Sequence, residues 1–280
     1  MITGLIAAMA NSVELLLERY ILDKKQVSWK KNLNIGFITI SLFMLIGSPF
    51  FFKYNPLYLS KTNIIYLAVV IFLSVVFNSL FFFGLKHTKV NEAEPLILTS
   101  WIFTIISAAI IYPDERNTIG IALAIIASGS VLLSHLKKHH LQLDRYAFCI
   151  LLSAFLISIH DLFAKKLLTV YDPYSFYFIR CVLCSVIFLF MYRIFVREKS
   201  RISKATLMLI LFANVAVIAR YVFMYWSYKI NGLVYTSLLM CLAPVIILVG
   251  SFVFLKEEIR PKNIAASVII VACVVISIVL

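Results

Sequence analysis

The chain has 280 residues, of which 62% are hydrophobic and 14% are charged, and its mean hydropathy is +0.99. This composition excludes an ordinary soluble globular domain, in which about 25% of residues are charged. The net charge of +13 does not indicate nucleic-acid binding, because the lysines and arginines cluster in short turns between apolar stretches.

About ten apolar stretches, each near 20 residues long, follow one another along the chain. A stretch of this length can cross the hydrocarbon of a bilayer as a helix. The pattern therefore predicts an all-α integral membrane protein with ten transmembrane helices. The predicted spans are residues 4–21, 33–52, 64–85, 93–112, 118–136, 146–168, 174–196, 206–228, 233–255 and 261–280.

The second half of the sequence repeats features of the first half. Glu115 follows Lys86 by 29 residues, and Glu258 follows Lys229 by the same interval. Each half holds five spans, and an odd number of spans turns the second copy over in the membrane. We therefore predict two inverted five-helix repeats, residues 1–140 and 141–280. Repeats of this kind place a substrate site near the midplane, between the halves.

Loop charges predict the orientation of the chain. Most of the lysines and arginines that lie between spans are in the odd-numbered loops. The positive-inside rule places these loops in the cytoplasm and both termini outside. We expect a multi-pass protein of the cell membrane, in the inner membrane of a bacterium.

The layout and the end of each half resemble the drug/metabolite transporter superfamily, of the EamA type. In the ninth span, Ala243-Pro244-Val245 followed by Phe254-Leu255-Lys256-Glu257-Glu258 resembles that family's small-Pro-Val and Leu-x-Glu pattern. The first half keeps an acidic turn at Glu115 but lacks the proline. Lys165 and Arg180 resemble a lysine and an arginine that are common in the first and second helices of a repeat.

The sequence also departs from the family in two ways. The Trp-Gly that is usual in the first span is replaced by Ala10-Asn11-Ser12. Family members usually keep both termini in the cytoplasm, whereas the loop charges predict the opposite. The resemblance covers essentially the whole chain, and the layout is more diagnostic than any single residue.

The resemblance implies a secondary transporter, not an enzyme, that exports a small metabolite by alternating access. We expect no cofactor, no metal site and no nucleic-acid partner. The expected partners are membrane lipids, a small-molecule solute and protons, and the expected assembly is a monomer or a homodimer.

Ionisable residues well inside a span are the best candidates for the solute site, since burying one costs about 2.5–3.5 kcal/mol. Glu14 lies near the middle of the first span, and Glu18 lies one turn further along the same face. The two carboxylates repel each other in a low dielectric, so one is expected to hold a proton more readily than a free glutamate. Glu14 is the first candidate for the carboxylate that a coupling proton or a solute cation occupies. The alternative is that Glu18 pairs with a basic residue near the surface and Glu14 only fixes packing.

The sixth span contains His160-Asp161, followed one turn later by Lys165. One interpretation is an Asp161–Lys165 ion pair. The other places Asp161 in the cavity opposite Glu14, with His160 relaying protons near neutral pH. A histidine in a helix bundle can also be a purely structural hydrogen-bond partner.

Arg180 and Arg220 lie inside the seventh and eighth spans. A guanidinium at that depth needs a partner, either a protein carboxylate or an anionic group of the solute. We predict solute contact for Arg220 and a mainly structural role for Arg180.

Amide and phenol groups in the eighth span are further candidates. Asn214, Tyr221 and Tyr225 share one face of that helix, and such polar groups at mid-span point to the bundle interior. Asn78 precedes Tyr221 by 143 residues, which gives a polar group at matching depth in the third span.

These carboxylates, guanidinium groups and aromatic rings favour a small zwitterion, such as an amino acid, or an amphipathic organic cation. The alternative is an integral-membrane enzyme or a lipid flippase that acts on lipid-linked substrates, with His160-Asp161 as acid and base. No His, Asp or Glu cluster with metal-ligand spacing supports the enzyme.

Overall fold

The computed structural model describes residues 1–23, 27–87, 90–135, 145–195, 203–255 and 261–279. These residues form α-helices and two short 3-10 helices, with no strand among them. The helices are, in chain order, α1 (Ile2–Asp23), α2 (Trp29–Phe51), η1 (Pro56–Leu59), α3 (Lys61–His87), α4 (Val90–Ile111), η2 (Pro113–Glu115), α5 (Thr118–His135), α6 (Arg145–Leu168), α7 (Pro173–Phe195), α8 (Lys204–Asn231), α9 (Leu233–Met240), α10 (Ala243–Leu255) and α11 (Pro261–Val279).

Each predicted span coincides with one helix to within a few residues, except the ninth. There the helix is broken at Cys241 and Leu242, and α9 and α10 replace one continuous span. Pro244 accounts for the break, because it has no N–H and its ring clashes with the carbonyl four residues earlier. That carbonyl belongs to Met240, the last residue of α9.

The surface of the bundle is apolar and its interior holds polar groups. Phe50 is 82% exposed, and Ile46 and Phe212 are also largely exposed, whereas His160 and Asp161 are buried. Five helices, α2, α3, α6, α7 and α8, are long and apolar enough to cross a membrane, and shorter apolar segments lie in α4, α5, α9 to α10 and α11. This arrangement is the one expected in a lipid bilayer. Lipid tails solvate apolar side chains, whereas polar groups are stabilised by partners inside the bundle. The chain is a multi-pass membrane protein.

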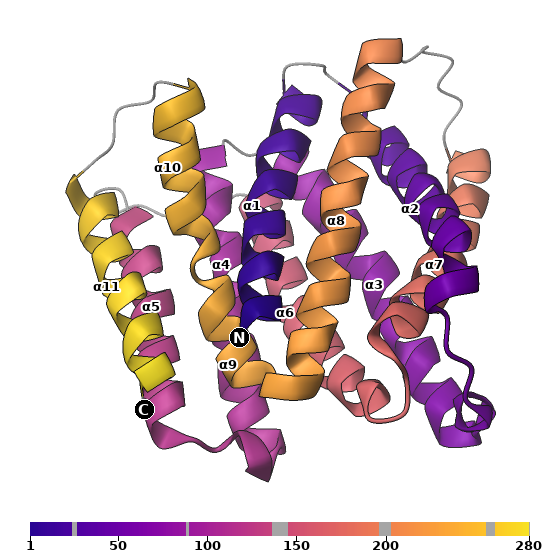
Figure 1. The fold of residues 1–280 in the computed structure, drawn as a ribbon. Helices are drawn as coiled ribbons and strands as arrows, with labels where there is room; N and C mark the ends of the chain where they lie inside the picture. The colour runs from indigo at the N-terminus through magenta and orange to yellow at the C-terminus, as the bar shows by residue number, and fades with distance from the viewer. Residues whose placement is uncertain (24–26, 88–89, 136–144, 196–202, 256–260, 280) are drawn as a thin grey trace.

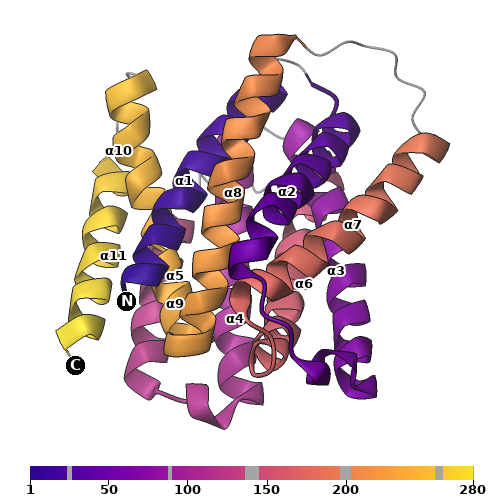
Figure 2. The same ribbon diagram turned by 45° about the vertical axis from the view of Figure 1, so that its right-hand side comes forward.

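Helices that are distant in the sequence pack side by side (Figures 1 and 2). α1 runs along α8, and α3 runs along α6. α4 also packs on α6, and α1 also contacts α10. Two further pairs, α2 with α7 and α5 with α11, complete the bundle. The first and second halves of the chain are thus interleaved.

The bundle is densely filled at the end where α1 begins and α8 ends. The largest cluster of buried apolar side chains includes Tyr171, Phe176, Tyr225 and Tyr228, and also Leu233 at the start of α9. Tyr225 touches Phe176 with ring centroids 5.0 Å apart. We infer from these buried rings that this end of the molecule is closed.

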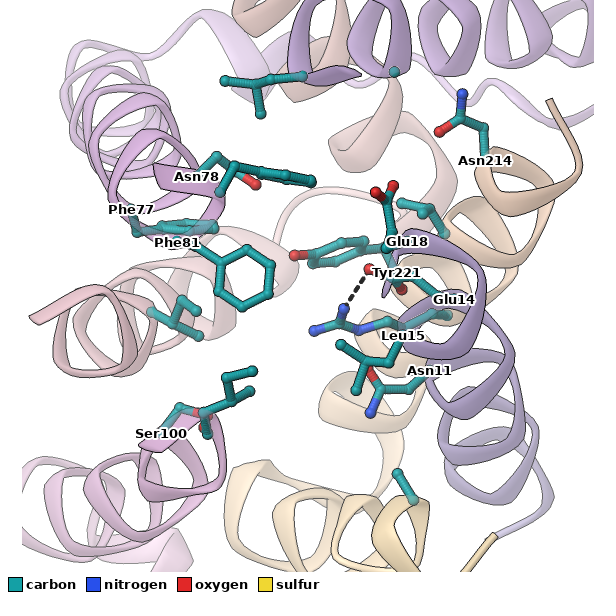
Figure 3. A pocket seen from close by; sticks show the side chains of 18 of the residues that line it. Asn11, Glu14, Leu15, Glu18, Phe77, Asn78, Phe81, Ser100, Asn214 and Tyr221 are labelled. Carbon is teal, nitrogen blue, oxygen red and sulfur yellow. Dashed lines mark hydrogen bonds and ion pairs between the residues drawn. The ribbon is translucent and has the colours of Figure 1, made fainter. Parts of the chain in front are cut away.

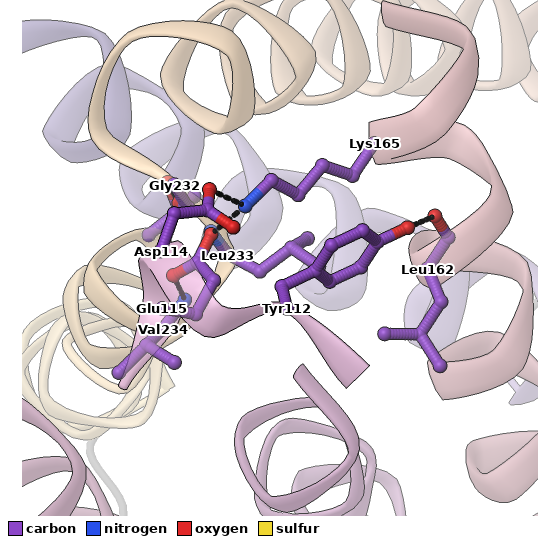
Figure 4. A network of polar contacts seen from close by, with 9 residues as sticks. Tyr112, Asp114, Glu115, Leu162, Lys165, Gly232, Leu233 and Val234 are labelled. Carbon is purple, nitrogen blue, oxygen red and sulfur yellow. Dashed lines mark hydrogen bonds and ion pairs between the residues drawn. The ribbon is translucent and has the colours of Figure 1, made fainter. Parts of the chain in front are cut away.

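A polar junction, the Glu115 junction, ties the two halves together at the same end (Figure 4). The buried Glu115 carboxylate accepts hydrogen bonds from the backbone N–H groups of Leu233 (2.6 Å) and Val234 (3.0 Å). These are first-turn N–H groups of α9, which have no partner within the helix. The Lys165 ammonium bridges Glu115 (2.5 Å) and Asp114 (2.7 Å). A carboxylate of the first half thus caps a helix of the second.

Two further details of the Glu115 junction follow from Lys165. Its hydrogen bond to Asp114 lowers the pKa of that carboxyl below its ordinary value. Its ammonium also lies 4.5 Å from the ring of Tyr112, whose hydroxyl donates a hydrogen bond to the Leu162 carbonyl (2.7 Å). Lys165 therefore contacts Asp114 and Glu115, and the predicted pairing of Lys165 with Asp161 is not formed.

Gly232 is the residue that lets Glu115 approach α9. Its φ is 85°, in the left-handed region that favours glycine. A Cβ on Gly232 would lie 2.5 Å from Oε1 of Glu115. The position therefore needs glycine both for its backbone conformation and for space.

We predict that Gly232→Ala destabilises the protein by about 1–3 kcal/mol, because it strains the backbone and displaces Glu115. The measurement is the thermal unfolding of the purified protein in detergent. Gly129→Ala is the matched control, since a Cβ at Gly129 meets nothing within 4 Å. A Gly232→Ala protein as stable as the Gly129→Ala protein would contradict this role.

Candidate functional site

A cavity of about 100 Å³ lies between the helices (Figure 3). Its lining comes from both halves of the chain, namely α1 to α4 and α6, α7, α8 and α10. On α1 and α2 the lining residues run from Asn11 to Glu18 and from Asn32 to Ile40. These segments lie toward the end where α1 finishes and α2 starts, opposite the Glu115 junction. The cavity is therefore offset from the closed end.

Most of the predicted solute-binding residues lie together in this cavity. Those that line it are Glu14, Asn78, Asn214, Arg220 and Tyr221. Figure 3 shows Glu14 and Glu18, from α1, facing Phe77, Asn78 and Phe81, from α3. Asp161 and Tyr225 do not line the cavity, since both are buried behind it.

An ion pair in the cavity joins α1 to α8. Oε1 of Glu14 and Nη1 of Arg220 are 2.8 Å apart, with side chains 12% and 15% exposed (Figure 3, dashed line). Only one hydrogen bond connects them. Oε2 of Glu14 and Nε of Arg220 are buried without a partner. The pair therefore retains one free acceptor and one free donor beside the cavity.

Glu18 is the second carboxylate of the cavity, and it is 8% exposed. It accepts a hydrogen bond from the Asn32 amide at 2.6 Å. Among the described residues, no cation lies within ion-pair distance of Glu18. The expected alternative, a basic partner for Glu18 near the surface, is therefore not found among the side chains that the structure describes.

Asn32 was not identified from the sequence. The predicted second span began at residue 33, which placed Asn32 in a basic loop, whereas α2 begins at Trp29. The helix buries the Asn32 amide. The sequence signal that could have identified Asn32 is its position at helical spacing from the apolar residues that follow it.

Behind the cavity, a chain of polar contacts starts at Asp161. Its Oδ2 accepts a hydrogen bond from Tyr228 (2.9 Å), and its Oδ1 lies 3.0 Å from Nδ1 of His160. Nε2 of His160 is 3.3 Å from Nη1 of Arg180, which also donates to the Tyr225 hydroxyl. Both oxygens of Asp161 thus have partners, and Asp161 is absent from the cavity lining, so neither of the two interpretations of Asp161 offered by the sequence describes its contacts here. His160 is likewise absent from the lining.

Aromatic rings form the wall beside the two arginines. Tyr177 and Tyr221 are stacked with ring centroids 5.1 Å apart. The Tyr221 ring lies 4.5 Å from the guanidinium carbon of Arg180 and 4.7 Å from that of Arg220. Contacts of this kind stabilise a buried cation. Trp101, from α4, also lines the cavity.

The residues that resembled family motifs fall into three places. Pro244 and Arg180 line the cavity, and Glu115 and Lys165 form the Glu115 junction. Glu257 and Glu258 lie outside the described residues. Within the part of the chain that is described, no three His, Cys, Asp or Glu side chains form a group that could hold a metal ion.

An apolar helix bundle that encloses a charged cavity is the arrangement expected of a membrane transporter. Residues 144–279 match the model of the EamA-like transporter family. The match over these residues confirms the resemblance seen in the sequence. Members of the family are membrane transporters.

The whole chain is similar in fold to solved structures, of which 28 chains match. One of them, titled "Crystal structure of protein", has a TM-score of 0.79 over 99% of this chain and 95% of that chain. The identity is 11%, so the likeness is one of fold. No curated protein sequence matches the chain.

We predict that Glu14→Gln and Arg220→Gln each destabilise the protein by about 3–5 kcal/mol, because each leaves a buried charge unpaired. The double variant should lose less free energy of unfolding than the sum of the two single variants, since neither buried charge remains in it. The measurement is a double-mutant cycle on the free energy of unfolding in detergent.

The matched control is the Lys53–Asp172 pair at 3.8 Å, in which the Lys53 side chain is 77% exposed. Lys53→Gln should change the free energy of unfolding by about 1 kcal/mol or less. Strictly additive effects at Glu14 and Arg220, or effects as small as at Lys53, would contradict the importance of the buried pair.

Proposed function

We propose that this chain is a secondary transporter that moves a small polar or amphipathic metabolite by alternating access. The observation that carries the proposal is the cavity with the Glu14–Arg220 pair, held between helices of both halves. Ionisable groups deep in a membrane protein are costly and mark solute or ion pathways. The match of residues 144–279 to a transporter family supports the same conclusion.

The proposal includes two inverted five-helix repeats, residues 1–140 and 141–280. Two kinds of contact support it. The first helix of each half packs on the third helix of the other, as α1 on α8 and α6 on α3. Lys86, at the end of α3, donates to the Leu22 carbonyl at the end of α1 (3.0 Å). Lys229, which follows Lys86 by 143 residues, likewise donates to the Tyr171 carbonyl just after α6 (3.2 Å).

Alternating access requires that the closed end open while the other end closes. The contacts that would separate are those of the Glu115 junction and the tyrosine packing around Leu233. The backbone N–H groups of Leu233 and Val234 would then need water in place of Glu115. The Glu115 junction is therefore the proposed gate on its side of the membrane, and the direction of net transport, export, rests on the resemblance to the family.

The proposed solute contacts are Glu14, Asn78, Asn214, Arg220 and Tyr221, which all line the cavity. Glu18 is the proposed site of proton exchange, because an amide is its only described hydrogen-bond partner and a proton can neutralise it without breaking an ion pair. His160 suits that role less, since both of its ring nitrogens are already engaged. Amino-acid-like zwitterions and organic cations are the solutes that the charges suit.

The experiment is exchange across sealed proteoliposomes that contain a trapped pH dye and labelled amino acids, organic cations or phosphorylated metabolites. Saturable exchange of one class, absent from protein-free vesicles, is the expected result. Folded protein that exchanges no member of the panel would contradict the transporter.

The Glu18→Gln variant tests whether proton movement is coupled to solute transport. We predict that this variant still exchanges solute but no longer moves protons with it, because glutamine cannot bind and release a proton. The measurement compares solute flux and the internal pH signal at several external pH values. The control is Asp172→Asn, at a carboxylate outside the cavity. Unchanged proton movement in the Glu18→Gln protein would contradict the proton role.

A further inference from the structure

The two arginines of the cavity differ in how their charges are balanced. Arg220 has the Glu14 carboxylate at 2.8 Å. Arg180 has none, as no carboxylate among the described residues lies within ion-pair distance of it. Arg180 also lines the cavity and is only 1% exposed. A guanidinium withdrawn from water in this way needs an anionic partner.

One end of the Arg180 guanidinium is fixed by the protein. Nη1 donates to the Tyr225 hydroxyl and to Nε2 of His160. Because arginine only donates, Nε2 must carry no proton, so the hydrogen of His160 is on Nδ1 and is donated to Asp161. Asp161 is therefore connected to Arg180 only through a neutral histidine. It orients the guanidinium without forming an ion pair with it.

The other edge of the guanidinium is free. Nε is buried without a hydrogen-bond partner, and no described residue accepts a hydrogen bond from Nη2. Nε–H and Nη2–H point the same way along one edge, which is the geometry that a carboxylate accepts with both oxygens. The Tyr221 and Tyr177 rings, 4.5 and 5.3 Å from the guanidinium carbon, hold the group in place.

We propose that Arg180 is the anion-receiving group of the cavity and binds the carboxylate of the transported solute through its free edge. This assignment rests on the proposed transport function and replaces the structural role predicted for Arg180 from the sequence. Glu18, which has no cationic partner among the described side chains, is the other charge of the lining that is left unbalanced there. A solute with a carboxylate and a cationic group balances both charges, whereas a simple organic cation leaves Arg180 without a partner.

The test measures binding to the purified full-length protein in detergent, by the shift in its unfolding temperature and by the change in its tryptophan fluorescence, to which Trp101 in the lining contributes. The probes are two matched sets that differ only in their charged groups. One set is butanoate, 2-aminobutanoate and propylamine, and the other is 3-phenylpropanoate, phenylalanine and phenethylamine. Inorganic phosphate is the probe for a different oxyanion.

The expected result is that carboxylate members bind and the amines do not. Arg180→Gln should weaken their binding at least tenfold. Arg180→Lys, which keeps the charge but loses the two-donor edge, should weaken it less. Arg145→Gln, at an exposed arginine outside the lining, should leave it unchanged. If Arg180→Gln does not fold, the wild-type series and Arg180→Lys decide the question.

Three results would overturn the proposal. They are amines that bind as tightly as the acids, an Arg180→Gln protein with wild-type affinity for the acids, and wild-type protein that binds phosphate or nothing in place of the carboxylates. The two proposals fail separately. Exchange of labelled amines without binding of any acid would reject the Arg180 assignment alone. Acids that bind through Arg180 but never cross the membrane would reject the transporter alone.

Discussion

Charges buried among apolar helices must find their partners within the protein, because no water is there to solvate them. The Glu14–Arg220 pair meets this constraint across the contact between α1 and α8, and so joins the two halves of the chain at the cavity. Asp161 has His160 and Tyr228 as its partners, and Glu115 has Lys165 and the backbone N–H groups at the start of α9. These contacts fix how the helices sit against one another.

The Glu115 junction and the cavity differ in how far their buried polar groups have partners. At the Glu115 junction every carboxylate oxygen of Glu115 has a partner among Lys165 and the first backbone N–H groups of α9. In the cavity, by contrast, Glu14, Arg180 and Arg220 each keep a buried polar atom without a partner. The first arrangement suits a closed gate, and the second suits a site that a solute completes.

The helices could be predicted from the sequence because long apolar runs are a strong local signal. The depth of Glu14 and Arg220 also marked them as candidates. Their pairing could not be predicted, since it depends on the packing of α1 against α8 between residues that are 206 positions apart in the sequence. For the same reason, the sequence did not reveal that Asp161 lies behind the cavity, that Lys165 turns to Glu115, or that Arg180 has a free edge.

The central claim is that one cavity serves both sides of the membrane in turn. Leu15 lines the cavity and has no polar role there, so Leu15→Cys in a chain without its native cysteines reports on access. The measurement is labelling by membrane-impermeant thiol reagents applied to either face of sealed vesicles. The account predicts labelling from both faces, slowed by a transported solute. Labelling that is confined to one face under every condition would contradict alternating access.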